Sequence, residues 1–152
     1  DSAILLGGDR EVTNNQKTGW SVIIEEEVGP SQPALAYKIP HHGSKNADRE
    51  DIWKHLLVPE PVGVVTPFTP SGLPTEQDIS RLQERTSELL LTAPPRAAEA
   101  TSGNRTVDKM ARIDTRDRRY LTSDMGHVQI RFGPDDDADN CDVSLGGRAF
   151  AR

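Results

Sequence analysis

Two short segments carry the side chains best suited to chemistry. Gly8-Asp9 follows an apolar run at 3–6, and His41 and His42 stand in the segment Pro40-His41-His42-Gly43-Ser44. Carboxylate and imidazole groups are ligands for Zn, Mn or Fe, and the two oxygens of a carboxylate can bridge two ions. The residue types therefore predict a metal site to which Asp9, His41 and His42 contribute.

This ligand set is incomplete. A catalytic zinc ion ordinarily takes three protein ligands, and a two-metal site takes more. Of the remaining histidines, His55 falls on an expected helix and His127 at the start of an expected strand. We interpret His55 as a surface residue and His127 as a strand-edge residue. Either residues outside this chain complete the site, or the site is inactive.

The elements that must position these residues alternate between strand and helix patterns, which is typical of an α/β fold. Apolar spacing predicts a helix over 46–57 that Pro59 stops, and a second helix that begins at Thr75, whose hydroxyl caps the Asp78 amide. Because ligands collect at strand ends in open α/β sheets, the two segments should meet there. The expected strands are 3–6, as a buried strand, with 19–25, 34–39, 62–66, 88–92, 120–132 and 142–145.

Composition limits the classes of protein. The 152 residues suit one domain, and 18 Lys and Arg against 24 Asp and Glu give a formal charge of −6, which disfavours nucleic-acid or membrane binding through net charge. A single cysteine, Cys141, excludes an internal disulfide. No apolar run approaches the roughly 18–20 residues of a membrane span, so we expect a soluble, cytoplasmic protein. The chain opens without Met, directly before a strand-like run, so we expect its natural beginning to be missing.

The composition also divides the chain. Residues 93–119 are rich in small and charged residues and are expected to form a polar, basic, exposed insertion. Its basic side chains could guide a polyanionic substrate, although a solvated loop is the simpler interpretation. Residues 120–152 are expected to supply terminal strands that complete the sheet. Trp20 and Trp53 are expected in the core.

The order of three segments resembles a known family. Ala-Ile-Leu-Leu-Gly-Gly-Asp-Arg-Glu at 3–11, Ala-Tyr-Lys-Ile-Pro-His-His-Gly-Ser-Lys-Asn at 36–46 and Val-Gly-Val-Val-Thr at 62–66 are similar to the second half of metallo-β-lactamase-fold hydrolases. Within that family the chain looks most like the branch of ComEC-type competence domains and phosphorylcholine esterases. The resemblance covers roughly 1–92 and, more weakly, Asp124-Met-Gly-His-Val.

This resemblance implies a fold and a chemistry. The fold would be the second half of an αβ/βα sandwich, a mixed sheet with helices on one face. Asp9 would bridge two divalent ions, Zn or Mn, and His42 would bind one of them. His41 would face a substrate phosphate or supply a proton, although the two histidines could exchange roles, and Ser44 would cap the following helix. The implied reaction is hydrolysis of a phosphodiester or related ester by a metal-bound hydroxide.

The chain also departs from the family. The motif His-x-His-x-Asp-His of the first half is absent, and Gly72-Leu73-Pro74 stands where relatives often have Gly-His-Pro. We therefore expect a fragment or subunit that is inactive alone and needs an N-terminal half or a partner chain, in a hetero- or homo-oligomer. The alternative is a non-catalytic structural or interaction module of a larger assembly, with an incomplete metal site.

Overall fold

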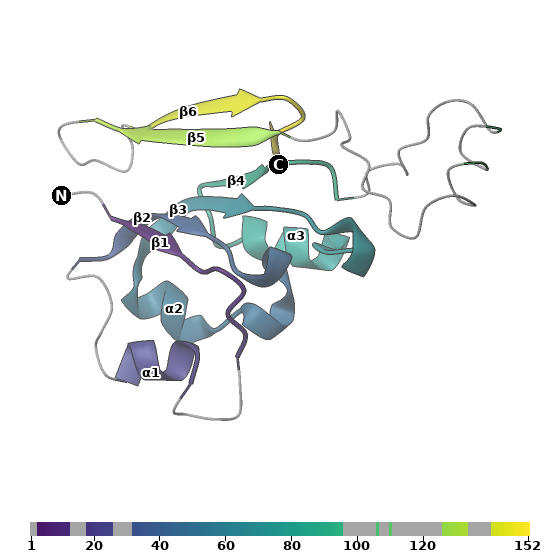
Figure 1. Ribbon diagram of the computed structural model, residues 1–152. Coiled ribbons are helices and arrows are strands. Elements are labelled where there is room, and N and C mark those ends of the chain that lie inside the picture. Colours follow the sequence, from purple (N-terminus) through teal and green to yellow (C-terminus); the bar gives the residue numbers. More distant parts are fainter. Residues whose placement is uncertain are drawn as a thin grey trace.

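A five-stranded mixed sheet forms the centre of the protein. The computed structural model describes residues 3–12, 18–25, 32–95, 106, 110, 126–133 and 141–152. The sheet has the order β1-β2-β3-β4-β7, in which β1 to β4 are parallel neighbours and β7 runs antiparallel to β4 (Figure 1). This confirms the α/β class. The strands are β1 (Ile4–Leu6), β2 (Ala34–Lys38), β3 (Leu57–Val65), β4 (Glu88–Leu91) and β7 (Phe150–Ala151).

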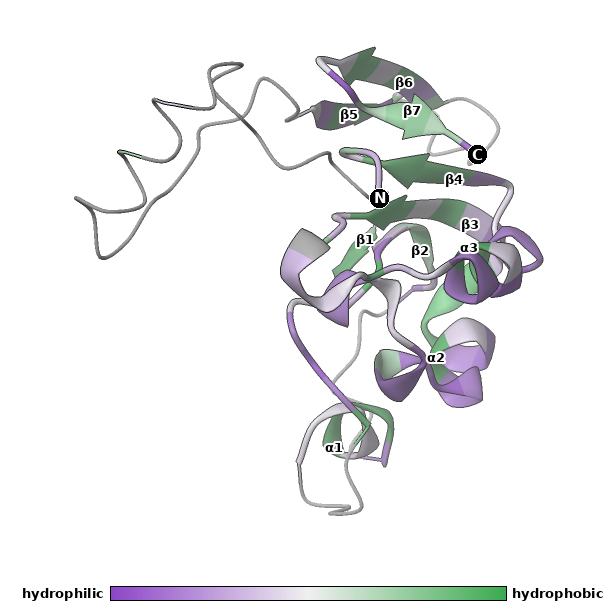
Figure 2. Cartoon of the chain, turned by 90° about the vertical axis from the view of Figure 1, so that its right-hand side faces the viewer, coloured by the Kyte–Doolittle hydropathy of each residue, from purple (hydrophilic) through white to green (hydrophobic). Residues whose placement is uncertain are grey.

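The two faces of the sheet are covered differently. Helices α1 (Trp20–Glu25), α2 (Glu50–His55) and α3 (Glu76–Gln83) lie on one face, and the antiparallel pair β5 (His127–Phe132) and β6 (Cys141–Gly146) lies on the other (Figure 1). Figure 2 shows hydrophobic strands in the sheet and hydrophilic outer faces on α2 and α3. Burial between these layers supplies the main driving force for folding. Short 3₁₀ turns occupy His41–Gly43, Lys45–Ala47 and Thr69–Ser71.

Each face has its own core. Trp20, Tyr37, Ile52, Ile79 and Leu89 belong to the cluster between sheet and helices, each at most 1% exposed. On the opposite face Ala36, Val62 and Leu90 pack against half-buried residues of the β5–β6 pair: Val128, Ile130, Phe132, Cys141 and Val143. The predicted alternation of Val128, Ile130 and Phe132 is confirmed, because these three are half-buried and their neighbours are exposed.

The segment 19–25 was expected to be a strand, and this prediction is wrong. Trp20–Glu25 is helix α1. Its Trp20 is buried, and Ile23 and Ile24 pack against the main core. These residues stand at positions i, i+3 and i+4, which lie on one side of a helix. Packing of that side outweighs the preference of β-branched residues for strands.

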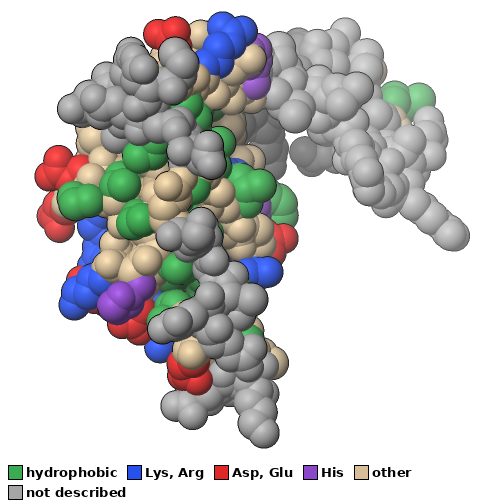
Figure 3. All heavy atoms as spheres, turned by 90° about the vertical axis from the view of Figure 1, so that its left-hand side faces the viewer, with side chains coloured by type: hydrophobic (Ala, Val, Ile, Leu, Met, Phe, Trp, Pro, Cys, Tyr) green, Lys and Arg blue, Asp and Glu red, His purple; other side chains and the backbone are tan. Residues whose placement is uncertain are grey.

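Strand β1 was expected to be buried, and this too is wrong. It pairs only with β2 among the described residues, at one edge of the sheet, where Ile4 and Leu6 are 51% and 71% exposed. The β5–β6 pair packs against residues of β2, β3 and β4 and leaves the side chains of Ile4 and Leu6 uncovered. Hydrophobic side chains also reach the surface between charged ones on the face in Figure 3.

The helix expected over 46–57 is shorter. Ser44 accepts a hydrogen bond from the Asn46 amide and so caps the turn Lys45–Ala47, not α2, which runs from Glu50 to His55. The helix ends before Pro59 because β3 already begins at Leu57. The strand expected over 62–66 is confirmed as the carboxyl part of β3. His55 is exposed, as expected.

Several other expectations hold or lie outside the described residues. Thr75 caps α3, and the Asp78 carboxylate accepts a hydrogen bond from the Thr75 amide in return, which completes a capping box. Trp20 is buried, and Trp53 is partly buried against the same core. Most of the expected insertion 93–119, together with 120–125, lies outside the described residues. Within the described part of the chain, no helix is long and apolar enough to cross a membrane.

Candidate functional site

The two segments that could bind metal meet at one edge of the sheet. Strands β1 and β2 are parallel neighbours, with Leu6 opposite Lys38, so their carboxyl ends lie side by side. The amide of Gly7 donates to the Lys38 carbonyl at 2.9 Å, and the amide of His41 donates to the Gly8 carbonyl at 3.1 Å. The structure thus brings the Gly8-Asp9 loop and the histidine pair together.

Gly7 allows this close approach. A Cβ atom at Gly7 would lie 2.7 Å from Pro40 Cδ, 2.8 Å from Pro40 Cβ and 2.9 Å from the Lys38 carbonyl oxygen. Carbon atoms in contact prefer separations of about 3.5–4.0 Å. Any side chain at this position would therefore push the two segments apart.

The histidines lie in an uncommon backbone conformation. The φ angles of His41, His42 and Gly43 are +44°, +56° and +81°, so three consecutive residues are left-handed. This region is disfavoured for residues with a Cβ atom, and such residues cluster at functional sites where the surroundings hold them. We refer to His41–Gly43 as the histidine turn.

His42 has a defined tautomer. Its Nδ1 atom lies 2.8 Å from the Thr66 carbonyl oxygen, which can only accept, so Nδ1 donates the hydrogen. The ring also stacks on Phe68, with centroids 4.8 Å apart and planes at 18°. In the neutral ring Nε2 therefore keeps its lone pair. A histidine that binds metal is commonly held in this way, by a hydrogen bond from its other nitrogen to a carbonyl or carboxylate.

His41 faces a carboxylate instead. Its Nδ1 atom lies 3.1 Å from Glu11 Oε1. Nδ1 is shielded from solvent and makes no hydrogen bond of good geometry, so Glu11 lies against His41 without bonding to it. The sequence reasoning missed Glu11. Its position two residues after Asp9 was the available signal, because it places another carboxylate on the same loop.

Asp9 is exposed on this loop, and its charge acts on Lys38. Burial lowers the pKa of Lys38 below its ordinary value, and the negative charge of Asp9 offsets part of that shift. Lys38 is the last residue of β2, so its amine belongs to the same sheet edge. Within the described ranges, no group of three or more His, Cys, Asp or Glu side chains could hold a metal ion. The described residues therefore offer a partial ligand set.

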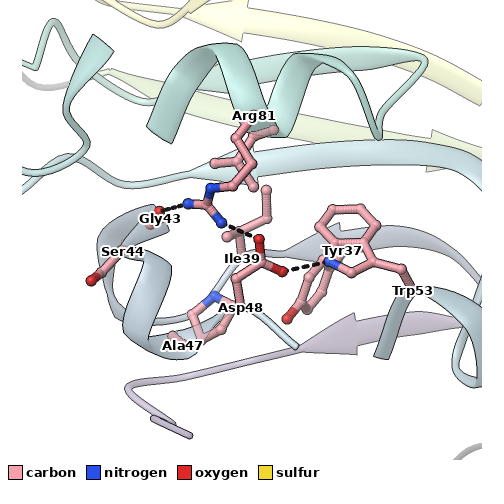
Figure 4. A pocket seen from close by; sticks show the side chains of 10 residues that line it. Tyr37, Ile39, Gly43, Ser44, Ala47, Asp48, Trp53 and Arg81 are labelled. Carbon is pink, nitrogen blue, oxygen red and sulfur yellow. Dashed lines mark hydrogen bonds and ion pairs between the residues drawn. The ribbon is translucent and has the colours of Figure 1, made fainter. Parts of the chain in front are cut away.

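A partly buried ion cluster supports the histidine turn from α3, and the sequence reasoning missed it as well. Arg81 pairs with Asp48 and donates to the Gly43 carbonyl oxygen at 2.8 Å (Figure 4). It also pairs with Asp78 at 2.9 Å. Burial alone would raise the pKa of Asp78, but hydrogen bonds from Thr75 and the Arg81 guanidinium hold it below its usual range. We call Asp48, Asp78 and Arg81 the Arg81 cluster.

The neighbouring side chains leave little space around this cluster. Tyr37 and Trp53 pack edge to face, with ring centroids 5.4 Å apart, and Trp53 Nε1 donates to Asp48 at 2.7 Å. Burial, with the nearby charge of Asp48, raises the pKa of Tyr37 far above its ordinary value, so the phenol stays neutral. We therefore interpret the Arg81 cluster as a support for the histidine turn and not as a ligand pocket.

An open cavity lies at the carboxyl ends of the next two strands. Its volume is about 300 Å³, and its lining includes Thr66, the residue whose carbonyl holds His42. The cavity is lined by Thr66, Pro67, Thr92, Ala93 and Gly126. The histidine turn therefore has open space near it, at the sheet edge where α/β proteins commonly bind ligands.

The fold and this site define an α/β protein with a carboxylate and a histidine pair at the carboxyl edge of a largely parallel sheet. No protein-family model, no curated protein and no solved structure matches the chain.

Proposed function

We propose that the chain is part of a metal-dependent hydrolase of the metallo-β-lactamase fold that acts on phosphodiester or related ester bonds. The observation that carries the proposal is the convergence of Asp9 and the histidine turn through the hydrogen bond from the His41 amide to the Gly8 carbonyl. The order of the Gly-Asp and His-His-Gly-Ser segments, and their resemblance to that family, supplies the reaction class.

The donors at this edge fit part of a dinuclear site. Asp9 offers an exposed carboxylate, and His42 offers an Nε2 lone pair because Thr66 accepts from its Nδ1. Bound divalent ions would activate water by lowering its pKa to about 7. Since the described residues hold no set of three ligands, further ligands would come from an N-terminal half or a partner chain, and the chain alone would be inactive.

The other residues of the edge would act on the substrate. Glu11 lies against Nδ1 of His41, which leaves Nε2 as the nitrogen of His41 that contacts a substrate oxygen or supplies a proton to the leaving group. Lys38 places a cationic group beside Asp9 at the same edge, where a phosphate would bind. Different partners on the two Nδ1 atoms favour His42 as the ligand and His41 as the substrate-facing group.

The proposal is tested by metal binding. Calorimetric titration of the complete protein, with its N-terminal half or partner chain, should show binding of Zn²⁺ or Mn²⁺ that the double variant Asp9→Asn, His42→Ala abolishes while circular dichroism stays unchanged. The matched control is His55→Ala, which removes an exposed histidine of α2 and should bind as the wild type does. In the complete protein, the same double variant should lose phosphodiesterase activity.

A second function competes with this one. The partial ligand set also fits a non-catalytic module of a larger assembly. In that case the complete wild-type protein would bind neither ion, and any phosphodiesterase activity of the complete protein would be insensitive to the double variant. Either result would reject the hydrolase proposal.

A further inference from the structure

The Arg81 cluster joins two parts of the chain that are far apart in sequence. Arg81 lies on α3, Asp48 follows the turn Lys45–Ala47, and Gly43 ends the histidine turn. One guanidinium contacts Asp48 and donates to the Gly43 carbonyl oxygen (Figure 4). The nitrogen that donates to Gly43 also donates to Asp78. A planar fork of donors can satisfy several acceptors at once, which a lysine amine cannot do in the same geometry.

Each carboxylate of the cluster has a partner besides Arg81. Asp48 accepts from Trp53 Nε1 at 2.7 Å, and Asp78 accepts from the Thr75 amide at 3.0 Å and from its hydroxyl at 2.6 Å. The Gly43 carbonyl oxygen accepts a hydrogen bond from the Arg81 side chain. Loss of Arg81 would therefore leave both carboxylates with donors, and its specific effect would fall on the carbonyl at the end of the histidine turn.

The histidine turn needs such support. Its two non-glycine residues have positive φ angles, a conformation that persists only where the surroundings impose it. The beginning of the turn is held by the bond from the His41 amide to Gly8, and the middle by the Gly43 amide donating to the Pro40 carbonyl at 2.9 Å. Gly43 also packs closely on α3, since a Cβ atom there would lie 3.2 Å from Leu82 Cδ1. The end of the turn thus rests on α3.

We propose that Arg81 is a positioning residue that fixes the histidine turn through the Gly43 carbonyl and thereby sets the orientation of the His42 ring. The Gly43 carbonyl belongs to the peptide group that joins Gly43 to Ser44, and only the Cα atom of Gly43 separates it from the peptide group that joins His42 to Gly43. Rotation at Gly43 therefore moves the backbone from which His42 projects. With the turn held, His42 Nδ1 reaches Thr66 and Nε2 is presented as an acceptor. The importance of this role for catalysis rests on the proposed function, whereas the effect of Arg81 on the orientation of the His42 ring does not.

The test is the tautomer of His42 in the metal-free protein, measured from imidazole ¹⁵N chemical shifts. The wild type should show one neutral tautomer with the hydrogen on Nδ1. Arg81→Ala should show a mixture of both tautomers at His42. Arg81→Lys keeps a positive charge between Asp48 and Asp78 but loses the planar guanidinium that donates to Gly43. It should therefore give the same mixture of His42 tautomers with the fold retained. This variant replaces Arg81→Ala in the test if the alanine variant does not fold.

The matched control is Arg85→Ala, one turn further along the chain. Arg85 pairs with Glu50 at 2.8 Å and lies over the Trp53 ring, but it has no contact with the histidine turn in the described structure. This variant should lower the unfolding midpoint and leave the His42 tautomer unchanged. If Arg81→Lys and Arg85→Ala both leave His42 as in the wild type, Arg81 has a purely structural role and the proposal is wrong.

A metal arm separates this inference from the proposed function. Substitution of residues that orient a ligand commonly weakens metal binding by about 10–100-fold, so Arg81→Lys should weaken Zn²⁺ binding by about tenfold or more. If the complete wild-type protein binds no Zn²⁺, the proposed function fails, and the tautomer measurement still decides the role of Arg81. If Zn²⁺ binds the wild type and Arg81→Lys equally, the positioning role is rejected.

Discussion

Substitution of Gly7 by alanine should loosen the junction between the two segments of the site. The added Cβ atom would lie 2.7 Å from Pro40 Cδ, about 1 Å inside the separation that carbon atoms prefer. A proline ring and the Lys38 carbonyl cannot rotate away, so the backbone must move. Overpacking of this kind costs about 1–3 kcal/mol, and the lower entropy of the unfolded alanine chain returns about 0.4–1 kcal/mol. We expect a net loss of about 1–2 kcal/mol.

The assay combines urea unfolding with amide hydrogen exchange. Gly7→Ala should lower the free energy of unfolding and speed exchange of the His41 amide, because separation of the segments lengthens its bond to Gly8. Gly8→Asn is the control: Gly8 has a φ of +59° and open space around its Cα atom, and asparagine tolerates that conformation. It should stay within about 0.5 kcal/mol of the wild type. Unchanged stability of Gly7→Ala, or equal losses in both variants, would refute the close-approach argument.

Three further predictions concern stability. Thr75→Ala should lower the free energy of unfolding by about 1 kcal/mol in urea by removing the cap of α3; Thr75→Ser should not, and equal losses would contradict the capping role. The pKa of Asp78 is lowered in the folded state, so its stabilising contribution is complete above its unfolded value near 4 and is lost as the pH falls through the folded value. The stability gap between wild type and Asp78→Asn should therefore narrow in urea titrations between about pH 5 and pH 2, and a constant gap would rule this out. Ile52→Ala should cost about 2–5 kcal/mol by leaving a cavity in the core, whereas Leu6→Ala, at an exposed edge position, should change the unfolding free energy by about 0.5 kcal/mol or less; comparable losses would show that burial does not decide these effects.

Much of the fold follows from local patterns. The cap at Thr75 and the runs that became β2, β4 and β6 were predictable, because capping and alternation depend on neighbouring residues. Helix α1 was not, because Ile23 and Ile24 favour a strand by themselves and only their packing with Trp20 on the core selects a helix. The exposed position of Ile4 at the edge of the sheet could not be predicted from the local sequence either, because the order of the strands depends on the whole sheet.

The site was predictable in part. The residue types of Asp9, His41 and His42 and their place after strands were enough to expect that their segments converge. The supporting contacts were not, because Arg81 lies 38 residues beyond Gly43 in sequence and such contacts depend on how α3 docks. Glu11 was overlooked for another reason: a lone carboxylate in a polar loop is common, and only the His41 contact at 3.1 Å distinguishes it.

The short strand β7 has a consequence of its own. Phe150 and Ala151 cover the side of β4 that faces away from β3, and the Arg152 amide donates to the Leu89 carbonyl at 2.9 Å. Three consecutive leucines of β4 have almost no contact with solvent. Without this small cover, an apolar strand with free backbone groups would become a template for other chains, which is how amyloid-like self-association starts. The two residues of β7 thus occupy the side of β4 that would otherwise be open to pairing with another chain.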